Sequence, residues 1–279
     1  MRRLIATVAL AALFPSVVEA QAALTFDAAS VKVVPPGAPT ARVAGSGPPW
    51  REGSGRLHQP AITMKNLLIE AFGVREFQIA GPGWIESDRF VIDAVMPSTT
   101  TREQLRVMMQ NLLADRFKLA AHRELREQSV YVLTIAKNGP KLQGVEKGAT
   151  LPAPKGDEPE FDADGFPNPI YFAKGRGGTT DFQINGRSRI TGQQASMKDL
   201  TDALMRRLGR LVTDQTNLTG KYDLVLNFSG VSLSASAADN PMPDLFQALQ
   251  SELGLELEAR KGPVQTVVVD HLERIPTGN

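Results

Sequence analysis

The chain has 279 residues and no cysteine. This absence excludes disulfide bonds, thiol catalysis, cysteine-ligated metals and a lipid-modified N-terminal cysteine. The fold must therefore be held together by non-covalent packing. Without its first twenty residues the chain still has about 259, and a chain of that length can bury a sizeable apolar core.

Long hydrophobic runs are also scarce, and the one at the N-terminus is short. Arg2 and Arg3 precede an eleven-residue apolar run, Leu4 to Phe14, and Val18-Glu19-Ala20 places small or apolar residues where a signal peptidase cleaves. Eleven residues make about 16 Å of helix, well short of a bilayer core of ~30 Å. We therefore expect residues 1–20 to be a signal peptide cleaved between Ala20 and Gln21. The product should be exported, periplasmic or extracellular, and soluble, without a transmembrane segment.

Neither sign of charge is in excess. Without Arg2, Arg3 and Glu19, the 31 basic and 30 acidic side chains become 29 of each. A balanced chain has no bulk attraction to nucleic acid or to anionic membranes. We therefore expect no nucleic-acid partner.

The common catalytic motifs are missing as well. The sequence has no GxSxG, HExxH or GxxxxGK[ST] motif, and no GxGxxG after a strand. Its three histidines, His58, His122 and His271, would have to converge in space to form a triad or a metal site. DADG at Asp162 to Gly165 matches the start of a calcium loop but lacks the closing glutamate in register. The sequence therefore predicts no catalytic residue, no metal and no cofactor.

An internal repeat organises what the chain does contain. Thr63-Met64-Lys65 recurs as Ser196-Met197-Lys198, and in both copies a hydroxyl residue suited to an N-cap opens an apolar stripe of helical spacing. Gly73 and Gly209 then suit the left-handed residue that ends a helix. We interpret the chain as two copies of one unit, with the alternative that two unrelated stretches share common helix-start chemistry.

Each copy is predicted to run strand, helix, strand, strand, helix, strand, strand, and the short strand after the first helix of copy one is expected at Phe77 to Ile79. The second helix of copy one opens at Thr100 or Thr101 with a capping-box pattern, and that of copy two spans about Asp244 to Leu253 and stops at Gly254. The apolar face of the helix in copy one is expected to carry Leu105, Met108, Met109, Leu112 and Leu113. Period-two alternation marks the closing strands, with a turn at Gly262-Pro263 in copy two. The fold class is therefore α+β, as two related β-α-β-β-α-β-β lobes with helices on one face of mainly antiparallel sheets.

The domain boundaries follow from this repeat. We expect a signal peptide at 1–20, a first repeat at 21–143, a linker or insertion rich in proline and glycine at 144–185, and a second repeat at 186–279. The linker contains four aromatic residues, which is unusual for a free linker, so part of it is expected to pack against the body. These residues are Phe161, Phe166, Tyr171 and Phe172.

Trp84 is the residue that the sequence singles out for binding. It follows Gly81-Pro82-Gly83 in a predicted turn, where a tryptophan either covers the core or presents an aromatic platform to a sugar or a peptide. Arg89, just after the turn, would be its polar partner. Trp84 and Arg89 are therefore the predicted binding residues.

Several long motifs resemble a known family. ITMKNLLIEAFGV, FQIAGPGWIESDRFVIDA, LLADRFKLAAHRE, NLTGKYDLVL, LGLELEARKGPV and DHLERIP are similar to the soil-associated family of exported bacterial proteins. The resemblance covers about Leu24 to Pro276. It implies export but no particular biochemical activity.

The repeat unit resembles a second, more distant family. SMKDLTDALMRRLGRLV, DLFQALQSELGLELEAR and VVVD are similar to the short N-terminal domain of secretins and TonB-dependent receptors. This resemblance implies a small periplasmic module of two helices on a sheet that contacts other envelope proteins and is not an enzyme.

The leading hypothesis is thus an exported, non-enzymatic binding or interaction protein of the cell envelope with a protein partner. The alternative is a secreted hydrolase or carbohydrate-binding protein that acts on envelope or environmental polymers. A pair of carboxylates suffices for glycoside hydrolysis, and sequence spacing does not decide whether two of them converge.

Overall fold

The computed structural model describes residues 24–35, 53–146, 149, 156, 159–173, 177–229 and 243–278. The predicted signal peptide and its cleavage site at Ala20 and Gln21 lie outside these residues. Within them the chain is a mixed α+β protein with five α-helices and three mainly antiparallel sheets. None of the described helices is long and apolar enough to cross a membrane.

Contacts divide the described residues into two compact units. Unit 1 takes its residues from 1–72, 86–119 and 272–279, and unit 2 from 73–85 and 120–271. Each unit is discontinuous in sequence and contains residues from both predicted repeats.

Unit 1 combines one antiparallel sheet, in the order β1-β4-β2, with two helices. Its elements are β1 (Ala28–Val33), β2 (Arg56–Thr63), α1 (Met64–Phe72), β4 (Arg89–Val95) and α2 (Arg102–Phe117). Phe90 of β4 and Phe117 of α2 meet edge to face with ring centroids 5.0 Å apart, and both are fully buried. The contact joins the sheet to the helix layer.

The predicted helix ends are confirmed. Thr101 caps α2, and its hydroxyl and Gln104 form the reciprocal capping box that the sequence indicated. The five apolar residues predicted for the inner face of α2 are all buried: Leu105, Met108, Met109, Leu112 and Leu113. Local spacing and hydroxyl chemistry were enough here because both act within a few residues.

Unit 2 contains two four-stranded sheets, in the orders β6-β10-β8-β7 and β3-β11-β5-β9. The strands of the first are β6 (Gln143–Gly144), β7 (Gly178–Ile184), β8 (Arg187–Ala195) and β10 (Tyr222–Ser229). Those of the second are β3 (Ile79–Ala80), β5 (Ala120–Ile135), β9 (Val212–Asp214) and β11 (Leu255–His271). The α-helices of unit 2 are α3 (Ile170–Ala173), α4 (Met197–Leu208) and α5 (Leu245–Ala248). The unit also contains the 3₁₀ turn η1 (Glu76–Gln78) and the π turn η3 (Leu249–Leu253). A second 3₁₀ turn, η2 (Gly83–Glu86), belongs to unit 2 except for its last residue, which belongs to unit 1.

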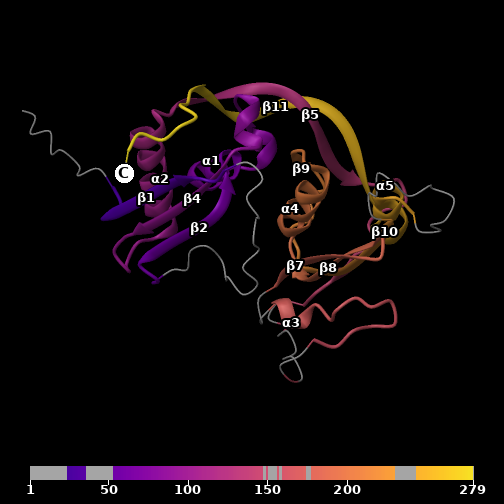
Figure 1. Cartoon of the computed structure of the whole chain (residues 1–279). Helices are drawn as coiled ribbons and strands as arrows, with labels where there is room; N and C mark the ends of the chain where they lie inside the picture. The colour runs from indigo at the N-terminus through magenta and orange to yellow at the C-terminus, as the bar shows by residue number, and fades with distance from the viewer. Residues whose placement is uncertain are drawn as a thin grey trace, which may run out of the picture. The chain divides into compact units, whose positions relative to one another are not determined.

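Helix α4 packs against β7 and β8 of the first sheet and against β9 of the second (Figure 1). Its buried face carries Leu200, Ala203 and Leu204, which join Leu133, Leu226 and their neighbours in one apolar cluster. Ser196 caps the helix and Gly209 ends it in the left-handed conformation, as predicted. This cluster supports the first sheet from one side and leaves its other face for further contacts.

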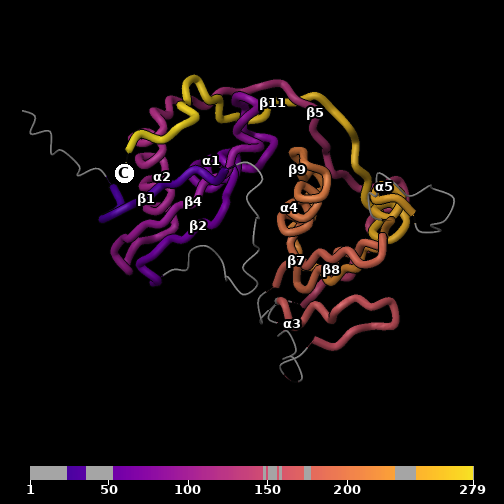
Figure 2. Tube along the Cα trace, in the orientation of Figure 1, coloured from indigo at the N-terminus to yellow at the C-terminus, as the bar shows by residue number. Residues whose placement is uncertain are grey.

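Two long strands replace the four short closing strands that the sequence predicted. β5 and β11 are continuous and pair antiparallel along their whole length, from Leu255 opposite Ile135 to His271 opposite Ala120 (Figure 2). The predicted turn at Gly262-Pro263 is wrong, because both residues lie inside β11 opposite Gln128 and Glu127. Proline is tolerated in a strand that borders an unpaired edge, and β3 pairs with β11 at Val267 and Val268, beyond the proline.

Two further predictions of local structure need correction. Phe77–Ile79 was expected as a strand, but Glu76–Gln78 forms a 3₁₀ turn and the strand begins at Ile79. Residues 178–184 were assigned to the linker, but they form β7 and pair with β8. Asn185 and Gly186 join β7 to β8 with positive φ angles of 49° and 74°. Asn-Gly between strands is a strong hairpin signal, and it was overlooked in the sequence.

Candidate functional site

The two faces of the sheet β6-β10-β8-β7 differ in chemistry because side chains alternate along each strand. Thr179 and Asp181 of β7 contact α4: the Thr179 hydroxyl donates to Asp199 O, and the Arg207 guanidinium pairs with Asp181. The alternate residues therefore lie on the opposite face, called the outer face here. The outer face carries Thr180, Phe182, Arg189, Thr191, Gln193, Asp223, Val225 and Asn227.

Part of the predicted linker packs on this outer face, as expected from its aromatic residues. Phe166 is 2% exposed and its ring lies under the Arg189 guanidinium, 4.3 Å from the ring centroid. Phe161 remains exposed. The carboxylates of Asp162 and Asp164 pair with Arg189, and the Arg189 hydrogen bond lowers the pKa of Asp162. The DADG carboxylates are thus engaged in ion pairs with an arginine side chain.

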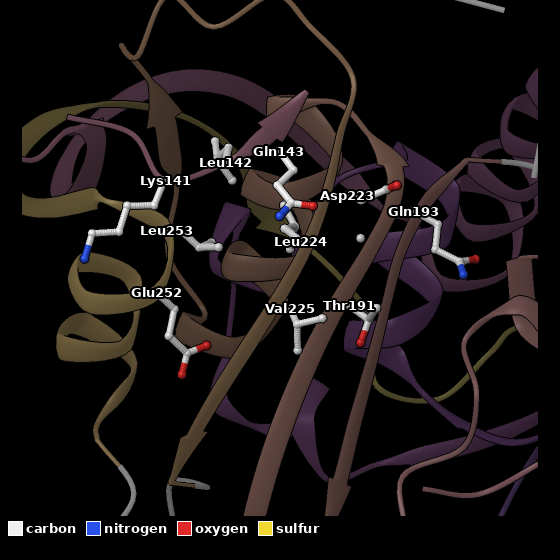
Figure 3. A pocket seen from close by; sticks show the side chains of 11 residues that line it. Lys141, Leu142, Gln143, Thr191, Gln193, Asp223, Leu224, Val225, Glu252 and Leu253 are labelled. Atoms are coloured by element: carbon white, nitrogen blue, oxygen red, sulfur yellow. The ribbon is translucent and has the colours of Figure 1, made fainter. Parts of the chain in front are cut away.

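A groove lies beside this covered region, on the strands β8 and β10 (Figure 3). It has a volume of about 510 Å³. Its lining residues come from four separate segments: Lys141, Leu142, Gln143, Thr191, Gly192, Gln193, Asp223, Leu224, Val225, Glu252 and Leu253. Figure 3 shows Thr191 and Val225 next to each other on the strands, with Lys141 and Glu252 at one side.

Backbone contacts hold the charged groups of the groove. Lys141 Nζ donates to Ser251 O at 2.8 Å, Glu252 Oε2 accepts from Asn227 N at 2.9 Å, and Asp223 Oδ1 accepts from Gln194 N at 2.8 Å. Each charged side chain is therefore anchored to backbone by at least one polar atom. Groups fixed before a ligand arrives lose less entropy on binding.

The helix end beside the groove is irregular. α5 continues into the π turn η3, and Gly254 ends it with φ +65°. Gly254 O accepts from Ala136 N at 3.0 Å and Leu253 O accepts from Lys141 N at 2.8 Å, so the segment after β5 is attached to this helix end. π turns inside helices occur often at functional sites. Here the turn places Glu252 against β10 and the attached segment places Lys141 and Gln143.

A second, smaller pocket of about 160 Å³ shares Thr191 and Gln193 with the groove. Its other lining residues come from the linker and from β7: Pro169, Phe172, Gly177, Gly178, Thr179 and Thr180. Thr180 and Gln193, which line it, each carry a buried polar atom, Oγ1 and Oε1, without a hydrogen-bond partner among the described residues.

The two residues predicted for binding lie elsewhere. Trp84 is half-buried in η2, next to the buried Ile85, and belongs to unit 2. Arg89 is the exposed first residue of β4 and belongs to unit 1. Neither lines the groove, and their role in binding stays a prediction.

Two of the three histidines, His58 and His122, form separate surface pairs with aspartates. His58 Nδ1 lies 2.6 Å from Asp93 Oδ1 in unit 1, and His122 Nδ1 lies 2.8 Å from Asp270 Oδ2 in unit 2. His122 Nε2 is also 3.6 Å from Glu124 Oε2. Across the described ranges, no group of three or more histidine, aspartate or glutamate side chains is placed to hold a metal ion.

The His122 pair gives a prediction for pH dependence. The hydrogen bond to Asp270 raises the pKa of His122 above its ordinary 6.5. A raised pKa in the folded state means that protonated His122 stabilises the fold, fully below pH 6.5, and that this contribution is lost as the pH rises through the folded pKa. Asp270→Asn should therefore lower the His122 pKa, measured by NMR titration of its imidazole resonances. An unchanged pKa would show that the Asp270 contact does not form in solution.

Comparisons with known proteins define the family. A profile described as "Protein of unknown function (DUF3738)" matches residues 65–272, well over half of the chain. The chain, an α+β protein with a groove on one sheet face, therefore belongs to the DUF3738 family. No curated protein gives a significant match. No solved structure gives one either.

Proposed function

We propose that the protein is a non-enzymatic binding protein and that the groove on β8 and β10 is its binding site. The observation that carries this proposal is a cavity of about 510 Å³ whose charged side chains are anchored by backbone contacts. Cavities of this size with a few fixed polar groups are the usual form of ligand sites. Lys141 supplies N–H donors, and Asp223 and Glu252 supply carboxylate acceptors.

The proposal places this function outside the cytoplasm. The basic start, the short apolar run and the cleavage pattern at Ala20-Gln21 support export to the periplasm or beyond. An envelope protein is the partner class that the similarity to the short N-terminal domain of secretins and TonB-dependent receptors suggests. The resemblance to the soil-associated family of exported bacterial proteins supports the same proposal.

We also propose that the chain arose by internal duplication of one unit. The element order β2-α1-β3-β4-α2-β5 is the same as β8-α4-β9-β10-α5-β11. β3 pairs parallel with β11, and β9 pairs parallel with β5. After β5, Lys141 N donates to Leu253 O at the end of η3, and after β11, Thr277 N donates to Arg116 O near the end of α2. These matching contacts support two copies of one unit that exchange their last strands.

Filling the groove tests the binding function. Thr191→Trp places a large side chain on the outer face between Gln193 and Val225, and an aromatic residue suits a strand. In pull-downs with residues 21–279 from periplasmic and outer-membrane fractions, read by mass spectrometry for proteins and glycans, the wild type should retain a ligand. Thr191→Trp should lose it.

Thr213→Trp is the matched control, because Thr213 is an exposed strand residue of β9 in the same unit and lies outside the groove. It should retain the ligand as the wild type does. Equal retention by both tryptophan variants, or a blank result for the wild type, would contradict the proposed site.

A hydrolase is the second candidate, and one observation favours it: Asp223 and Glu252 line the same groove. Two carboxylates across a glycosidic bond are the usual hydrolytic pair. In this alternative, Asp223→Asn or Glu252→Gln abolishes hydrolysis of a bound polymer while binding persists. If the wild type releases no product from a ligand that it retains, the binding function stands without hydrolysis.

A further inference from the structure

We infer that the groove and the smaller pocket form one continuous site for a neutral carbohydrate chain. This inference rests on the proposed binding function and names its ligand class. Four features of the site support this ligand class. The path across the strands suits an elongated ligand, the unpartnered polar atoms and the carboxylate acceptors suit hydroxyl groups, and the exposed aromatic ring suits the C–H face of a sugar.

The path of the site follows from strand register. Gly178 of β7 pairs with Gln193 of β8, and Asp223 of β10 pairs with Gln143 of β6. The backbone N–H of Gln194 donates to Asp223, which places Gln193 and Asp223 on neighbouring strands. These residues therefore form a row across the four strands, spanning about 14 Å at the usual strand spacing. Gly178 has no side chain, so the row is open at its β7 end, where the smaller pocket lies.

The unpartnered atoms lie at that end. Thr180 pairs with Thr191, so Thr180 and Gln193 are diagonal neighbours on the outer face. Their Oγ1 and Oε1 atoms are buried without a hydrogen-bond partner among the described residues. Leaving such atoms unpaired is unfavourable, and ligand or solvent hydroxyls satisfy them. A hydroxyl both donates and accepts, so it matches an amide oxygen and a threonine hydroxyl equally well.

The free acceptors lie at the other end. Within the described ranges, Asp223 and Glu252 each accept one backbone N–H through one carboxylate oxygen, and the second oxygen of each is left for a ligand. Lys141 is directed to Ser251 O. Two carboxylates against one lysine give the groove a net negative charge, which disfavours a phosphate or carboxylate ligand. They favour a neutral ligand that donates hydrogen bonds.

The exposed ring supplies an apolar surface. Phe172 of α3 lines the smaller pocket, is 46% exposed and packs edge to face on Phe182, with centroids 4.9 Å apart. The C–H face of a pyranose ring can pack on such a ring while its hydroxyls reach Thr180 and Gln193. An extended peptide would instead add to a strand edge through its backbone. This site consists of side chains on a sheet face and runs across the strands.

The test is calorimetric titration of residues 21–279 with neutral oligosaccharides of glucose, galactose, mannose or N-acetylglucosamine, and with an oligogalacturonate for comparison. We expect binding of at least one neutral series and no binding of the charged one. Gln193→Ala should weaken that binding about tenfold, the loss expected for one hydrogen bond to a buried group.

Thr180→Val separates binding from folding. Its hydroxyl has no hydrogen-bond partner among the described residues, so the variant should keep or raise the melting temperature yet bind the oligosaccharide several-fold more weakly. Thr213→Val in β9 is the matched control and should bind like the wild type. Unchanged affinity in both Gln193→Ala and Thr180→Val, or loss in Trp84→Ala alone, would overturn this site.

The experiments distinguish failure of the carbohydrate inference from failure of the proposed binding function. If no oligosaccharide binds but Thr191→Trp still removes a ligand retained from envelope fractions, the carbohydrate inference is wrong and the binding function stands. If Thr191→Trp removes nothing and no oligosaccharide binds, both are wrong. Preference for the charged oligosaccharide would also overturn the inference.

Discussion

Gly254→Ala should lower the free energy of unfolding by about 2–5 kcal/mol, combining a left-handed backbone penalty of about 1–2 kcal/mol with an overpacking cost of about 1–3 kcal/mol. Gly254 has φ +65°, and a Cβ there would collide with the carbonyl oxygen of Gly139 and lie 3.0 Å from Lys141 N. Both contacts are backbone atoms, which cannot rotate away as a side chain can. Urea unfolding followed by circular dichroism measures the loss.

Gly209→Ala separates the two causes. Gly209 also ends a helix in the left-handed conformation, with φ +60°, but a Cβ there meets no atom within 4 Å. The control should therefore lose about 1–2 kcal/mol, the backbone penalty alone. Equal losses in the two variants would show that the segment after β5 does not pack against Gly254 as described.

Gly254→Ala should also affect the groove. The clash would displace Gly139 and Lys141 from the end of η3, and the same segment continues to Leu142 and Gln143 of the lining. Ligand retention by the folded fraction should fall, whereas Gly209→Ala should leave it unchanged. This result would connect the packing at the helix end to the site.

Leu204→Ala should destabilise the protein by about 2–5 kcal/mol, the usual cost of a cavity in place of a buried leucine. Leu204 is fully buried in α4, within the apolar cluster that joins the helix to β8, β9 and β10. Denaturant unfolding monitored by circular dichroism measures the change in midpoint.

The matched control is Leu125→Ala on β5. Leu125 is 71% exposed, so its truncation should change the stability by no more than about 0.5 kcal/mol. A loss below about 1 kcal/mol for Leu204→Ala, or similar losses at both positions, would contradict the described core.

Local structure could be predicted from the sequence wherever the cause is local. The caps Thr101 and Ser196 and the ends at Gly73, Gly209 and Gly254 depend on backbone groups within one helical turn. The α+β class follows from the same periodicities. These features required no knowledge of distant residues.

Strand partners could not be predicted in the same way. β5 and β11 are far apart in sequence, and β11 runs on through Gly262-Pro263, where the sequence suggested a turn, because it pairs with β5 there. Strand register is set by long-range packing, which alternation alone does not report. β7 is a different case, because Asn185-Gly186 is a local hairpin signal that would have revealed it.

The groove was missed for the same physical reason. Its lining comes from 141–143, 191–193, 223–225 and 252–253, and each segment alone resembles an ordinary strand or helix end. The sequence pointed to Trp84 and Arg89 because a tryptophan in a glycine-rich turn is locally unusual. A groove of threonine and glutamine side chains becomes visible when the register places them on one face.

The most direct test of the central claim is amide hydrogen exchange of residues 21–279 with and without the ligand fraction retained in the pull-down. The binding account predicts slower exchange in β8, in β10 near Val225 and in residues 141–143. Slower exchange confined to η2 around Trp84, or no change in β8 and β10 despite retention, would contradict it.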